Sequence, residues 1–403
     1  MKINIKKFDY VFSVGFFIMH SSSAFEELIF YKNYILLICY LYFFIRIIYS
    51  ILHRKKINYD LILIFIIIFC FVSTFWSFDS STTIVQSIYL FAQSIVVIFI
   101  ANVFNWKDVF KLLLVSGLII TVCSYGVVYL YPEIGISHTV GQYGLWKGVF
   151  THKNNLGNVM VFYVMLNYFI IYNSNKLASK IIMFFIICLQ INLILKSGST
   201  TALVLLMFIT VLFIFLVILK CLKNLYLRIS IISCSISFLI LGIFILLNNI
   251  DNIMDFLGKD LTFSGRVSIW KTGIDLIKNR WLLGYGYKGT FTENSYFYNE
   301  FIKNITIPVN SLHSGYLEIL SYIGVIGSIF VVSAIIVYIK YSIKMFNLNF
   351  YPIIFISFLL LNNLIESAFL GSGNGLLWSF FVYTLIYMKN TLNSFELQKE
   401  DYQ

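Results

Sequence analysis

Apolar stretches of about 20 residues recur along almost the whole chain, and this repetition restricts the folds that it can adopt. Thr201 to Leu219 form one such stretch, in which no residue is charged. An α-helix of about 20 residues crosses the roughly 30 Å hydrocarbon core of a bilayer. Because 60% of the 403 residues are apolar and only three are proline, we predict one all-α, polytopic membrane domain over residues 1–403.

The apolar pattern predicts about 12 transmembrane helices, of which the first is short. They are centred near residues 14, 43, 67, 93, 120, 164, 186, 209, 238, 326, 360 and 380. Two longer polar intervals separate them, at residues 131–155 and 249–312. We expect the second interval to be a large periplasmic loop that contains short interfacial helices, and the first to be a smaller loop on the same side.

The basic residues indicate how the chain is oriented. If both termini are cytoplasmic, the cytoplasmic loops carry most of the cations outside the two long loops, namely Arg54, Lys55, Lys56, Lys107, Lys111, Lys176, Lys180, Lys220, Lys223, Arg228, Lys340 and Lys344. This bias follows the positive-inside rule, from which long loops are exempt. It also explains the formal net charge of +11, so we expect a lipid bilayer and no nucleic acid as a partner.

A helical pattern in the large loop runs from about Val267 to Asn279, and Ser264 can cap its start. Val267, Trp270, Ile274 and Ile277 recur at helical spacing and predict a helix that lies on the membrane surface. Arg266 then falls in the first turn, where free N–H groups and the helix dipole favour an anion. Its guanidinium can bind phosphate with two hydrogen bonds. The alternative is a surface arginine paired with Asp260 or a lipid phosphate.

Other cations lie at the predicted outer ends of spans. His152 and Lys153 stand where the first long loop returns to the membrane, and they either bind an anion or anchor the interface. Lys196 precedes a turn rich in hydroxyl groups, and Arg280 follows the predicted surface helix. The six cysteines lie in or beside apolar spans without metal-ligand spacing, so we interpret them as small core residues.

His313 follows the large loop and begins a predicted membrane helix. Projected on a continuous helix, Gly324 and Gly327 fall on the same face as His313, where small residues allow a neighbouring helix to approach. The dipole at a helix N-terminus disfavours a charged imidazole and favours the neutral ring that a general base requires. The alternative is an interfacial histidine bonded to a neighbouring loop.

Two acidic residues are predicted just inside the outer ends of spans, Glu318 and Glu366. Acids at such positions are costly and are candidates for function. A transporter should instead place polar groups near the midplane, where Gln93 and Asn167 are the only obvious candidates. This distribution favours an enzyme that works at the outer face over a transporter.

Four blocks, in this order, resemble the O-antigen ligase and polysaccharide polymerase (Wzy-type) superfamily of bacterial membrane glycosyltransferases. They are Gly148 to Gly157, Ser264 to Trp270, Leu283 to Gly286, and His313 followed after Ser314 and nine residues by Gly324-x-x-Gly327. The resemblance covers roughly residues 145–385. It implies an enzyme of the bacterial inner (cytoplasmic) membrane whose active site faces the periplasm or the cell exterior.

The resemblance also implies the chemistry, a glycosyltransfer that needs no metal or cofactor. The donor would be a glycan on undecaprenyl diphosphate, and the acceptor would be lipid A core or a lipid-linked glycan. Arg266 would hold the diphosphate and His313 would activate or align the acceptor hydroxyl, with both counted as catalytic. We expect further substrate-binding residues at His152, Lys153, Lys196, Arg280, Glu318 and Glu366.

The chain departs from the family at one turn. Members often carry Ser-x-Ser-Arg there, whereas this chain has Thr200 in place of the arginine. Lys196, Lys153 or Arg280 could supply the missing cation. The motifs do not distinguish a ligase from a polymerase of O-antigen, capsule or exopolysaccharide, and a protein O-oligosaccharyltransferase is a third possibility within the superfamily.

Overall fold

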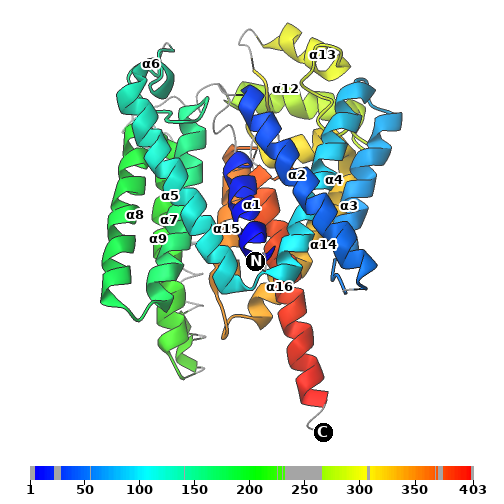
Figure 1. Ribbon diagram of the computed structural model, residues 1–403. Helices are drawn as coiled ribbons and strands as arrows, with labels where there is room; N and C mark the ends of the chain where they lie inside the picture. Colours follow the sequence, from blue (N-terminus) through cyan, green and yellow to red (C-terminus); the bar gives the residue numbers. More distant parts are fainter. Residues whose placement is uncertain are drawn as a thin grey trace.

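The structure is a computed structural model that describes residues 5–21, 29–54, 56–139, 141–224, 226–228, 230–231, 266–305, 309–367, 369–370 and 375–400. Within these ranges the regular elements are all helices, which confirms the predicted fold class. Strand-like pairing there is limited to one isolated bridge between Ile136 and Trp146. The helices stand side by side in a bundle (Figure 1).

Each predicted span in the described residues corresponds to a helix. These are α1 (Ile5–Met19), α2 (Ile29–Leu52), α3 (Leu61–Val72), α4 (Ser80–Val103), α5 (Trp106–Leu130), α7 (Lys153–Asn173), α8 (Leu177–Ser197), α9 (Thr200–Cys221), α14 (Gly315–Lys344), α15 (Tyr351–Ile365) and α16 (Gly375–Glu400). Seven helices of the described chain are long and apolar enough to cross a membrane, namely α2, α4, α5, α7, α8, α9 and α14. The span expected near residue 238 lies outside the described residues.

Three shorter helices gather at the end of the bundle opposite the C-terminus: α6 (Pro132–Gly135), α12 (Arg266–Asn279) and α13 (Tyr296–Asn304) (Figure 1). They belong to the two long loops predicted to face outward. The first loop is slightly shorter than predicted, because α7 already begins at Lys153. His152 caps that helix by accepting a hydrogen bond from the backbone N–H of Asn154 at 3.2 Å.

The orientation of the bundle can be tested on α12. We expect a cysteine in place of Lys278, whose side chain is 70% exposed, to react with a membrane-impermeant thiol reagent in intact spheroplasts, in a background without other cysteines. A cysteine in place of Lys176, in the turn between α7 and α8 at the other end, is the matched control and should react only after lysis. The reverse pattern would contradict this orientation.

The packing face of α12 differs from the predicted apolar stripe. Ile269, Leu276 and Ile277 are buried in a small outer core with Tyr285, Phe297, Phe301 and Leu312. Val267 and Ile274 are instead 46% and 41% exposed. The helix therefore carries two apolar faces, and one of them holds it against the rest of the loop. The expected Ser264 cap lies outside the described residues.

The α14 helix is interrupted, which corrects the predicted stripe from His313 through Gly324 and Gly327. The helix begins at Gly315, and Gly324 has φ of 61° and ψ of −169°. This break frees backbone groups that bond to the segment 281–286. Val325 donates its N–H to the carbonyl of Trp281 at 2.8 Å, and Gly286 donates to the carbonyl of Tyr322 at 2.9 Å. The break thus joins the large loop to the membrane helix.

Gly324→Ala should destabilise this junction. An added Cβ would overlap the carbonyl of Leu282, and the positive φ disfavours any L-side chain. We expect the free energy of unfolding to fall by about 1–3 kcal/mol, and the melting temperature of the purified protein to fall with it. Gly126→Ala in α5 is the matched control, because its Cβ would meet no atom within 4 Å. Equal melting temperatures for both variants would contradict this role of the break.

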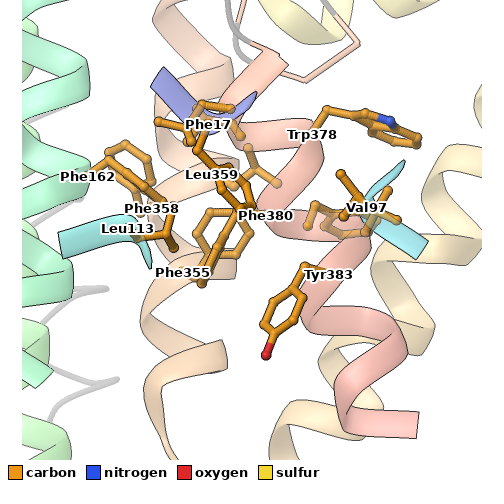
Figure 2. Close-up of a cluster of buried hydrophobic side chains, with 14 of the residues drawn as sticks. Phe17, Val97, Leu113, Phe162, Phe355, Phe358, Leu359, Trp378, Phe380 and Tyr383 are labelled. Atoms are coloured by element: carbon orange, nitrogen blue, oxygen red, sulfur yellow. The ribbon is translucent and has the colours of Figure 1, made fainter. Parts of the chain in front are cut away.

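The main core lies between the helices and is rich in aromatic side chains (Figure 2). Phe355 of α15 and Phe380 of α16 pack edge to face, with ring centroids 4.7 Å apart. The two amides predicted near the membrane midplane form hydrogen bonds between helices. Gln93 donates to the hydroxyl of Ser379 at 2.8 Å, and Asn167 donates to Gln190 at 2.9 Å. Both therefore act as connections between packed helices.

Candidate functional site

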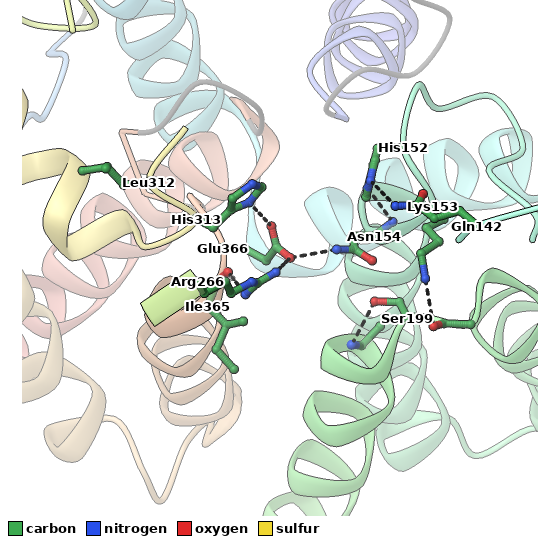
Figure 3. A network of polar contacts seen from close by, with 12 residues as sticks. Gln142, His152, Lys153, Asn154, Ser199, Arg266, Leu312, His313, Ile365 and Glu366 are labelled. Atoms are coloured by element: carbon green, nitrogen blue, oxygen red, sulfur yellow. Dashed lines mark hydrogen bonds and ion pairs between the residues drawn. The ribbon is translucent and has the colours of Figure 1, made fainter. Parts of the chain in front are cut away.

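Residues far apart in the sequence meet around the carboxylate of Glu366, at the end of the bundle that carries α12 and α13 (Figure 1 and Figure 3). Glu366 directly follows the last residue of α15, and Arg266 is the first residue of α12. The guanidinium of Arg266 donates to the backbone carbonyl of Ile365 and, from Nη2, to Oε1 of Glu366 at 3.2 Å. Both side chains are mostly buried, at 17% and 15% exposure.

His313 approaches the same carboxylate from the loop before α14. Its Nδ1 lies 3.9 Å from Oε2 of Glu366, and its side chain is 37% exposed. The φ of His313 is +49°, a left-handed conformation that is uncommon for histidine. Strained backbone of this kind concentrates at functional sites, where the surrounding contacts hold it in place.

The contacts that hold His313 in place act on its neighbour Leu312. The indole of Trp270 donates to the carbonyl of Leu312 at 3.0 Å, and the N–H of Leu312 donates to Oε1 of Glu318 at 3.1 Å. Glu318 is fully buried and also accepts from the hydroxyl of Tyr322 at 3.1 Å. Glu318 thus anchors the turn that presents His313, and its predicted contact with substrate stays a prediction.

Asn154 completes the group from the start of α7. Its Nδ2 donates to Oε1 of Glu366 at 3.1 Å. The carboxylate therefore bridges α7 on one side and α12 with α15 on the other. Sequence reasoning assigned no role to Asn154, although it lies in the block that ends the first long loop. A polar side chain in the first turn of an apolar helix was the available signal.

The electrostatics favour an ionised Glu366. Burial raises the pKa of this carboxyl, but the contact with His313 and the charge of Arg266 outweigh burial and hold the pKa below its usual value. His152 lies close enough to respond to the same charges. Burial lowers the pKa of His152. The charge of Glu366 acts against this lowering, whereas His313 and Lys153 add to it. A neutral His152 ring agrees with its role as a hydrogen-bond acceptor at the cap of α7.

The remaining predicted cations make their contacts elsewhere. Lys153 donates to the carbonyl of Gly198 at 3.2 Å, in the turn that lacks the family's arginine. The ammonium of Lys196 lies 5.9 Å from the ring centre of Trp146. Arg280 stacks on Phe78 at 4.3 Å and donates to a backbone carbonyl at 3.1 Å. Lys153 thus contacts this turn through Gly198, and it lies on the same helix, α7, as Asn154.

A hollow of about 320 Å³ opens beside the N-terminus of α7, and we call it the polar hollow because most of the residues that line it are of polar types. Its lining is basic and rich in hydroxyl groups, and it comprises Ile136, Ser137, His138, Thr139, Gln142, Lys147, Thr151, His152 and Lys153. The loop around it is held by backbone bonds, from Ser137 to the carbonyl of Leu145 at 2.8 Å and from Trp146 to the carbonyl of Lys196 at 3.0 Å. His152 borders both this hollow and the Glu366 group.

Comparison with known proteins agrees with the resemblance found in the motifs. Residues 183–332 match the family model described as O-Antigen ligase, which confirms the predicted relationship to this family over that part of the chain. Arg266 and His313 lie inside the matched segment, whereas Glu366 and Asn154 lie outside it. A search of curated proteins found no match. The family supports a membrane enzyme of the glycan-transferring ligase or polymerase kind.

Proposed function

We propose that this chain transfers a glycan from undecaprenyl diphosphate to a hydroxyl group at the outer face of the bacterial inner membrane. The observation that carries the proposal is the meeting of Arg266 and His313 at one carboxylate, at the end of the bundle where α12 and α13 lie. An anion-binding guanidinium and a basic imidazole are the two groups that this reaction requires. Both come from the segment that matches the O-antigen ligase family.

In the proposed step, Nε2 of His313 accepts the proton of the acceptor hydroxyl. The acceptor oxygen attacks the anomeric carbon, a new glycosidic bond forms, and the bond from that carbon to the phosphate oxygen breaks. Undecaprenyl diphosphate leaves with the bonding electrons. Arg266 stabilises the charge that develops on the diphosphate, and such stabilisation by fixed donors is a large part of catalysis. No metal or cofactor takes part in this scheme.

The polar hollow beside α7 is the proposed place for acceptor sugars. Its ammonium, amide and hydroxyl groups suit sugar oxygens, and His152 joins it to the Glu366 group. The acceptor is lipid A core for a ligase or another lipid-linked glycan for a polymerase. Protein O-glycosylation is a further option within the same chemistry, and the products of the assay below separate the three.

A flippase of lipid-linked oligosaccharides is the alternative from another class. Gln93 and Asn167, the midplane residues that such a path would use, are bonded to neighbouring helices, which favours the enzyme. Deleting the gene in its own bacterium distinguishes the two. We expect undecaprenyl-linked glycan to accumulate on the outer leaflet, where an added glycosidase can reach it. Accumulation on the inner leaflet would favour the flippase.

A further inference from the structure

We propose that Glu366 is an internal substitute for the donor phosphate: it pairs with Arg266 in the donor-free protein, and the incoming diphosphate displaces it toward His313. The catalytic base would then be completed only when the donor is bound. This inference rests on the proposed function, and it assigns to Glu366 a positioning role that governs the order of the reaction.

The guanidinium of Arg266 already has two hydrogen-bond partners. Its Nη1 donates to the carbonyl of Ile365, and its Nη2 donates to Oε1 of Glu366 at 3.2 Å. A phosphate that binds Arg266 through two N–H groups uses Nη2 together with either Nη1 or Nε, and Nη2 is the nitrogen that donates to Glu366. The Ile365 bond holds the guanidinium in place while the anion on its other side is exchanged. Donor and carboxylate therefore compete for one group.

His313 lies near the same carboxylate but beyond hydrogen-bond distance of it. The 3.9 Å between Nδ1 of His313 and Oε2 of Glu366 is an ion-pair distance, too long for a hydrogen bond. The carboxylate must move by about 1 Å to accept the Nδ1 proton at the 2.7–3.2 Å of such bonds. In this structure the carboxylate is held away from that position by its hydrogen bonds to Arg266 and Asn154.

Binding of the donor would shift the carboxylate of Glu366 from Arg266 toward His313. A diphosphate on Arg266 repels the carboxylate and removes one of its donors, so the Nδ1–H of a neutral His313 becomes the hydrogen-bond partner available to Glu366. A carboxylate bonded to Nδ1 fixes the tautomer in which Nε2 is the base, and it stabilises the imidazolium that forms when Nε2 takes a proton. Acceptor activation would therefore follow donor binding, and Asn154 would keep the carboxylate within reach of both partners.

Glu366→Gln tests the inference because it moves two measurements in opposite directions. Removing the competing charge should tighten binding of undecaprenyl diphosphate to purified protein in nanodiscs of neutral lipid, by about 3- to 10-fold. Glycan transfer with bound donor should fall by about 100-fold, since the base loses its partner. Glu366→Asp, which keeps the charge, should recover part of the rate.

Glu300→Gln is the matched control, since this glutamate of α13 pairs with Lys303 at 2.6 Å and should leave both measurements unchanged. Weaker diphosphate binding by Glu366→Gln would mean that Glu366 merely holds Arg266 in place, and it would overturn the inference. Normal transfer by this variant would overturn it as well. A wild-type protein that transfers no glycan would instead contradict the proposed function.

Discussion

His313→Ala should reach the membrane at wild-type levels and lose about 10²- to 10⁴-fold of its glycan-transfer rate, the usual contribution of a general base. His313 is 37% exposed and its turn is held through Leu312, so removal of the imidazole leaves the anchoring bonds intact. Binding of undecaprenyl diphosphate should persist, because Arg266 remains. The measurement compares initial transfer rates with diphosphate affinity in the same preparation.

Two further variants make this result specific. His313→Asn keeps the left-handed backbone, which asparagine tolerates, while it removes the basic nitrogen. It should be as inactive as His313→Ala. His53→Ala, at the exposed end of α2, is the matched control and should transfer glycan normally. Full activity of both His313 variants would remove the histidine from catalysis and leave the family relationship unaffected.

Arg266→Ala should lose most of its donor binding, by about 10- to 100-fold, the value of one strong bond between charged groups. Arg266→Lys should keep part of the affinity, because lysine supplies the charge without the two-pronged geometry. Lys271→Ala, an exposed cation on the same helix, is the matched control. The measurement compares the affinity of each purified variant and of the wild type for undecaprenyl diphosphate. Unchanged affinity in a well-folded Arg266→Ala protein would remove Arg266 from the donor site.

The helical architecture could be predicted from the sequence because lipid requires long, apolar, internally bonded segments. Arg266 and His313 could also be chosen, since each stands in a motif at the outer end of a span. Their common partner could not be foreseen. Glu366 lies about 50 residues beyond His313, and only the packing of α15 against α14 brings it to that turn. Asn154 reaches the carboxylate from a further helix, α7.

The projection of His313 onto a continuous helix failed for a local reason. It assumed regular φ and ψ values from residue 313 onward, whereas the helix starts at Gly315 and is broken at Gly324. Gly324, which we predicted to lie on a packing stripe, instead allows the backbone hydrogen bonds to the segment 281–286. Gly284 packs so closely against α14 that an added Cβ would lie 2.7 Å from the carbonyl of Tyr322. Such a junction depends on two segments about 40 residues apart, so neither segment alone reveals it.

We expect this chain alone to move glycan from undecaprenyl diphosphate to a hydroxyl acceptor. The most direct test uses purified wild-type protein in liposomes with lipid-linked donor, a candidate acceptor and excess EDTA. We expect elongated or ligated product together with an equal amount of released undecaprenyl diphosphate. Product that forms only when divalent metal is restored would contradict the proposed chemistry. Donor consumed without any glycan on lipid A core, lipid-linked glycan or protein would contradict the function itself.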